Sequence, residues 1–96
     1  MTNPWITEKG ETAIFVCDRG FVIVGRATID PHLAFHWLLK PGRTIRRWGT
    51  TNGLTELKDG PTSNTVLDKP AIQHIPFRAV LNIIEVDQNK WKLYLS

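Results

Sequence analysis

The chain has 96 residues, of which 42% are hydrophobic and 22% charged, and its formal net charge is +3. This length suffices for one hydrophobic core and not for two, so we predict a single domain over residues 1–96. The composition is close to the globular average, which excludes disorder along the whole chain. No apolar run approaches the ~18–20 residues that span a bilayer and no leader pattern opens the chain, so we expect a soluble protein that is not exported.

The single cysteine, Cys17, has no partner for an internal disulfide. It ends an apolar run at residues 13–17, as a small buried residue would. We therefore expect a buried thiol in a reducing compartment.

Two apolar, β-branched runs at residues 12–18 and 21–29 flank the turn signal Asp-Arg-Gly, which predicts a hairpin. The second run is apolar at successive positions, as in a strand covered on both faces. Further runs at 33–39 and 43–48 are divided by Lys-Pro-Gly, a second turn signal. Residues 12–48 therefore predict a four-stranded antiparallel meander.

A helical pattern interrupts the strands after residue 50. Two leucines three residues apart follow Thr51 and Asn52, either of which can cap a helix, and Gly60 stands where such a helix would end. We predict one short helix near 51–59.

The rest of the chain returns to strand patterns, with short segments at 65–68 and 71–75, a strong strand at 80–86 and alternating residues at 91–95. With about seven short strands and one helix, the fold class is mainly β: a small antiparallel barrel, half-open in the SH3-like or OB-like manner, or a twisted sheet. Residues 1–10 lack a period and predict an irregular N-terminal arm fixed by its tryptophan. An exposed closing strand at 91–95 could pair with a second copy to give a homodimer.

Positive charge concentrates in the middle of the chain. No acidic residue stands between Asp30 and Glu56, whereas one lysine and three arginines do. Side chains alternate along a strand, so we expect Ile45 to point inward and Arg46 or Arg47 outward. We call residues 43–53 the basic stretch, and its candidate binding residues are Arg43, Arg46, Arg47, Trp48, Thr50, Thr51 and Asn52.

Two ligands and one structural role fit the basic stretch. Arginines contact phosphates, the indole of Trp48 can stack on a base, and amides near Thr50 to Gly53 could hold an anion, which predicts weak, salt-sensitive binding of nucleic acid or phosphate. Arginine and tryptophan are also enriched at binding hot spots, which predicts a protein partner. In the purely structural alternative, Trp48 lies in the core and an arginine pairs with Glu56 or another acid.

A resemblance bears on origin. The sequence Ile-Arg-Arg-Trp-Gly-Thr-Thr starting at residue 45 is followed by Gly-Leu-x-Glu-Leu, Gly-Pro-Thr and, at residue 75, Ile-Pro-x-x-Ala-Val. Over about residues 43–86 the chain resembles a family of short bacteriophage and prophage proteins of unknown function. The resemblance implies a phage-type protein of the bacterial cytoplasm and supplies no activity.

Enzyme chemistry has little support in the sequence. If 33–39 is a strand, His32 and His36 lie about 13 Å apart, at ~3.3 Å per residue, which is too far to share a metal ion. His74 has no neighbouring histidine or cysteine, and neither serine lies in a nucleophile-elbow sequence. We therefore predict no catalytic residues, cofactor or metal, and a binding module that acts first on a protein partner and alternatively on nucleic acid.

Overall fold

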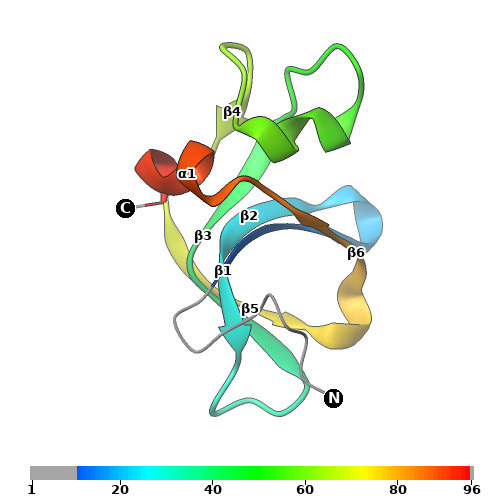
Figure 1. The fold of residues 1–96 in the computed structure, drawn as a ribbon. Helices are drawn as coiled ribbons and strands as arrows, with labels where there is room; N and C mark the ends of the chain where they lie inside the picture. Colours follow the sequence, from blue (N-terminus) through cyan, green and yellow to red (C-terminus); the bar gives the residue numbers. More distant parts are fainter. Residues whose placement is uncertain (1–10, 96) are drawn as a thin grey trace.

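The computed structural model describes residues 11–95, and the predicted arm at 1–10, with its tryptophan, lies outside them. Antiparallel strands form one sheet in the order β4-β3-β2-β1-β6, and β5 pairs with β3 (Figure 1). Their bounds are β1 Glu11–Cys17, β2 Val22–Ile29, β3 His36–Arg47, β4 Val66–Leu67, β5 Ala71–Pro76 and β6 Val80–Glu85. The mainly β class is confirmed, with these six strands in the described residues in place of about seven.

The predicted hairpin of β1 and β2 is confirmed and forms the centre of the sheet. The 3-10 turn η1 (Asp18–Gly20) joins the strands. Both strands bury residues on both faces, which explains their continuous apolar runs. One core contains Phe15 and the other Ile14, so a core lies against each face of the hairpin. Cys17 is buried as predicted, and burial, helped by the charge of Asp18, raises the pKa of its thiol.

β3 corrects the prediction of two strands at 33–39 and 43–48. It starts at His36 and continues through Lys-Pro-Gly, which forms an irregularity in the pairing with β2 instead of a turn. Gly42 faces Gly25 there, and a Cβ at Gly25 would lie 2.7 Å from the Pro41 carbonyl oxygen. A proline is tolerated within a sheet at such a bulge. Residues 12–48 therefore form three strands, and 33–35 belong to a loop.

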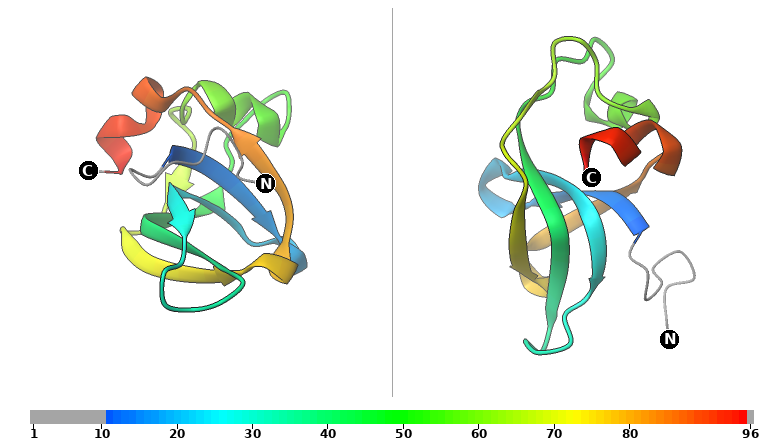
Figure 2. Two further views of the ribbon diagram at one scale, coloured as in Figure 1. Left: turned by 60° about the horizontal axis from the view of Figure 1, so that its bottom comes forward. Right: turned by 90° about the vertical axis from the view of Figure 1, so that its left-hand side faces the viewer.

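The sheet is strongly curled (Figure 2). β5 and β6 lie at opposite edges of the sheet, yet only the three residues of η3 (Phe77–Ala79) join them. The sheet must bend to bring these strands together at that end. Among the described residues no pairing joins β5 to β6, so the sheet is not closed into a barrel, and the twisted-sheet alternative holds.

The predicted strand at 91–95 is wrong. The segment is helical, with α1 (Gln88–Trp91) capped by the Asp87 carboxylate and followed by η4 (Lys92–Tyr94). Trp91 and Leu95, one helical turn apart, are buried, whereas Leu93 is 85% exposed. The indole Nε1 of Trp91 donates to the Leu57 carbonyl oxygen at 2.8 Å, which fixes the helix over the sheet. The homodimer predicted through this strand loses its structural basis.

The helix predicted near 51–59 is confirmed as the 3-10 helix η2 (Leu54–Asp59), which ends at Gly60. Its N-cap position is Gly53 rather than Thr51 or Asn52, because the backbone there has φ 99°, which favours glycine. Leu57 is buried and joins the core under α1. Within residues 11–95, no helix has the length and apolar character needed to cross a bilayer.

Candidate functional site

Two arginines of the basic stretch turn toward Asp68, just after β4. Nε and Nη2 of Arg46 donate to the two carboxylate oxygens at 2.8 and 3.2 Å. Arg43 donates from Nε to the Asp68 carbonyl oxygen at 2.6 Å and from Nη1 to the Tyr94 carbonyl oxygen at 3.0 Å. The hydrogen bonds and charge of Asp68 raise the pKa of Arg46. The charge of Arg46 is therefore balanced within the protein, and donors of Arg43 are occupied.

Arg47 and Trp48 extend from the end of β3 into solvent. In the part of the chain that the structure describes, the Arg47 guanidinium has no ion pair or hydrogen bond. Trp48 is 44% exposed and belongs to neither core, whereas the purely structural alternative placed it in the core. Ile45, on the same strand, is buried in the core that contains Ile14, as predicted. Arg47 and Trp48 thus remain accessible to a ligand.

The turn that follows is bonded to the protein itself. The Glu56 carboxylate accepts from the Thr51 amide at 3.1 Å and from Asn52 Nδ2 at 3.3 Å. Thr50 is partly buried. Glu56 therefore pairs with the turn and not with an arginine, and it occupies an amide that an anion would need.

A second surface lies at the opposite end of β3 and consists of two adjoining hollows of about 500 and 460 Å³. We call the pair the aromatic groove. Phe77 lines both hollows, so they meet at this residue. The other lining residues of the first are Ala34, Phe35, His36, Pro76 and Arg78, and those of the second are Trp37, Val80, Leu81, Asn82 and Ile83.

The groove rests on the core. The ring centroid of Trp37 lies 5.5 Å from that of the buried Phe15 and 5.1 Å from that of Phe77. Such edge and tilted contacts hold aromatic rings in preferred geometry. Trp37 and Phe77 are therefore fixed before any ligand arrives, which lowers the entropy lost on binding.

Phe35 combines backbone strain with exposure. Its φ is 61°, a left-handed conformation that costs a bulky residue roughly 1–2 kcal/mol. Its carbonyl oxygen accepts from the Phe77 amide at 2.8 Å, so the strained residue is joined to η3. Yet 79% of Phe35 is exposed, and little burial offsets the strain. Backbone strain of this kind is frequent at ligand-binding segments, which makes Phe35 a candidate binding residue.

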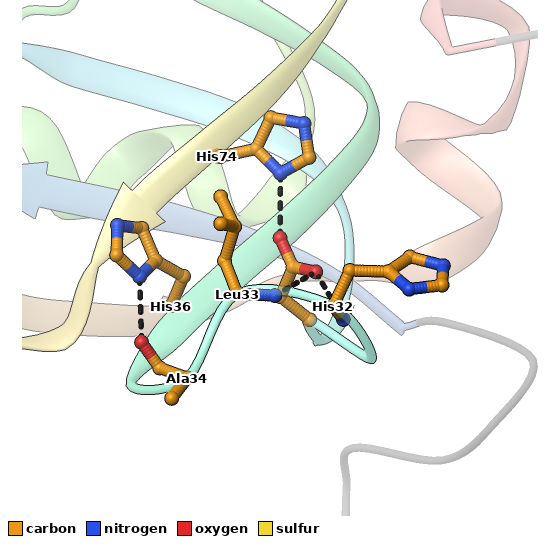
Figure 3. A network of polar contacts seen from close by, with 6 residues as sticks. His32, Leu33, Ala34, His36 and His74 are labelled. Carbon is orange, nitrogen blue, oxygen red and sulfur yellow. Dashed lines mark hydrogen bonds and ion pairs between the residues drawn. The ribbon is translucent and has the colours of Figure 1, made fainter.

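The Asp30 carboxylate is bonded to His32 and Leu33, at the start of the loop that carries Phe35; Figure 3 shows these two residues and His74. One carboxylate oxygen accepts from the amides of His32 and Leu33 at 2.9 and 3.0 Å, and the other is 2.5 Å from Nδ1 of His74 on β5. The His74 hydrogen bond, followed by the two amides, lowers the pKa of Asp30 from 3.8 to about 2. The carboxylate therefore ties the start of the loop to the neighbouring strand.

The sequence predicted that His32 and His36 lie on one strand, and this is wrong. His32 lies in the loop, and His36 begins β3 with Nδ1 2.8 Å from the Ala34 carbonyl oxygen (Figure 3). Within residues 11–95, no group of three or more histidine, cysteine or acidic side chains is placed to hold a metal ion.

Charge in the groove is positive. No aspartate or glutamate lines either hollow, whereas Arg78 lines the first. Arg78 is exposed, and its guanidinium has no hydrogen bond or ion pair to any described residue. The groove therefore presents aromatic surface beside an unneutralised cation.

The sequence did not reveal this groove as a site. Its aromatic residues come from two segments, 35–37 and 76–83, which meet only because β3 pairs with β5. One local signal was present: the run at 33–39 is apolar on both faces, whereas a strand with one buried face needs apolar residues on that face only.

No family model, no curated protein and no solved structure matches this chain. The resemblance to phage proteins stays a prediction.

Proposed function

We propose that this protein is a recognition module that binds another protein, and that it binds through the aromatic groove rather than the basic stretch. The observation that carries the proposal is the strained Phe35, exposed beside the fixed rings of Trp37 and Phe77. Exposed, preorganised aromatic residues are the usual anchors of protein interfaces. The proposal places the partner in an infected bacterial cytoplasm, on the strength of the phage resemblance alone.

Nucleic acid is the second candidate, favoured by the adjacent Arg47 and Trp48, which are both exposed. It would use few cations, because Arg46 is paired with Asp68 and Arg43 is bonded to carbonyl oxygens. Few phosphate contacts give weak, salt-sensitive binding.

A displayed library of random peptides, selected on the immobilised protein, tests the groove. Enriched peptides should lose at least about tenfold in affinity for Leu81→Asp, because a carboxylate enters an apolar hollow. Ile72→Asp is the matched control, since Ile72 is a similarly exposed apolar residue on β5 and lines neither hollow. Absence of enrichment, or peptides lost with Arg47→Glu and kept with Leu81→Asp, would contradict the proposal.

A further inference from the structure

We infer that the partner of the aromatic groove is an extended peptide segment with two apolar side chains on one face and a carboxylate beside them. This inference rests on the proposed function and specifies its ligand.

The two hollows fix the apolar part of the ligand. Phe77 lines both, so one ligand that fills both hollows must contact Phe77. Alternate side chains of an extended chain point the same way and lie roughly 6.6–7 Å apart, at 3.3–3.4 Å per residue. Residues i and i+2 of an extended segment can therefore place one side chain in each hollow.

The edge of β6 favours an extended backbone. Four consecutive residues, 80–83, line the second hollow. Within residues 11–95, β6 pairs only with β1, so its other edge offers unpaired backbone groups. An extended peptide can hydrogen-bond to such an edge while neighbouring pockets take its alternate side chains. The second hollow thus supplies both a pocket and a backbone template.

The positive charge of the groove determines which polar group the ligand carries. Arg78 lines the first hollow without a partner among the described residues, and neither hollow is lined by an acid. A ligand carboxylate next to the first apolar side chain can pair with the guanidinium, whereas a lysine there would be repelled. The ligand is therefore apolar and acidic rather than apolar and basic.

Fluorescence polarisation with two labelled peptides tests the inference. Both contain alternating leucine and threonine, and they differ only in one residue after the leucines, glutamate or lysine. The glutamate peptide should bind the wild-type protein about three- to tenfold more tightly at low salt, in line with a partly exposed ion pair. Arg78→Glu should reverse the preference, and Arg47→Glu, which removes an equally unpaired arginine from the far end of β3, should leave it unchanged.

The outcomes separate this inference from the proposed function. Equal binding of the two peptides, or a preference that Arg78→Glu does not move, overturns the carboxylate, while sensitivity of both peptides to Leu81→Asp would still support the groove. Binding of neither peptide overturns the extended apolar ligand, and the library selection then decides separately on protein recognition. Sedimentation showing that the groove is closed by a second copy of the chain also overturns it.

Discussion

The two ends of β3 carry opposite kinds of surface. At its C-terminal end, the arginines that look most suited to a ligand are largely bonded to the protein's own oxygens, through Asp68 and Tyr94. At its N-terminal end, aromatic rings and Arg78 face solvent without such partners. A dense motif in the sequence can thus be occupied by internal contacts, while a site assembled from distant segments stays open.

Replacing one aromatic residue at each end should give the largest contrast. We expect Phe77→Ala to weaken binding of groove-selected peptides by at least about tenfold, because both hollows lose their shared wall. Trp48→Ala removes the exposed aromatic residue at the C-terminal end of β3. It should leave peptide binding unchanged and reduce any binding of single-stranded DNA. Polarisation titrations measure both, after far-ultraviolet circular dichroism has shown that the variants fold. The reverse pattern would assign protein recognition to the basic stretch.

The substitution Phe35→Gly should raise the stability of the protein and weaken its binding of peptides. Relief of the left-handed strain, less the entropy cost of glycine, should raise the free energy of unfolding by about 0.5–1 kcal/mol. Peptide affinity should fall several-fold, because an exposed aromatic contact is lost. Arg19→Gly is the matched control, since Arg19 is exposed, has φ 59°, lies in η1 and lines neither hollow. Urea denaturation and polarisation should show stabilisation in both variants and weaker binding only in Phe35→Gly. A destabilised Phe35→Gly variant would show that the loop needs the ring for folding.

Removing Asp68 should expose what the basic stretch could do. Asp68→Asn releases Arg46, so affinity for single-stranded DNA should rise about threefold and the slope of log K against log salt should steepen by about 0.7. The unfolding free energy should change little, because exposed ion pairs contribute little to stability. Asp59→Asn, which removes an exposed acid without releasing an arginine, is the control and should have the smaller effect on both. If no variant binds DNA at low salt, nucleic acid is removed as a candidate.

The last prediction concerns how the contribution of Asp30 to stability depends on pH. Its pKa in the folded protein, about 2, is below the ordinary 3.8, so its contribution to stability is complete above about pH 4 and is lost as the pH falls toward 2. The difference in urea midpoint between the wild type and Asp30→Asn should therefore shrink as the pH falls from 4 toward 2. A difference that stays constant down to pH 2 would show that the charge of Asp30 does not hold the loop.

The elements that the sequence predicted well have local signals. The hairpin of β1 and β2, the strands β5 and β6, and the helix ending at Gly60 all follow from apolar runs and turn residues that are close in sequence. The closing segment could not be assigned in this way, because Trp91 and Leu95 fit both a strand period and a helical turn. The contact that decides between them, from Trp91 to the Leu57 carbonyl oxygen, spans 34 positions.

The candidate sites show the same limit. The sequence predicted that Arg46 or Arg47 points outward, and both are exposed, as is Trp48. No local signal showed that Asp68 bonds to Arg46 or that Glu56 bonds to the turn after Trp48. The groove residues carry no motif, and strand pairing alone brings them together.

The short η3 link has a consequence for assembly of the molecule. Because it joins β5, which pairs with β3, to β6, which pairs with β1, the groove needs residues 34–37 and 76–83 in one chain, with β3 and β5 paired. No fragment lacking either segment can display the binding surface. If the proposed function holds, a partner would bind chains in which both segments are folded together and would not bind fragments that lack one of them.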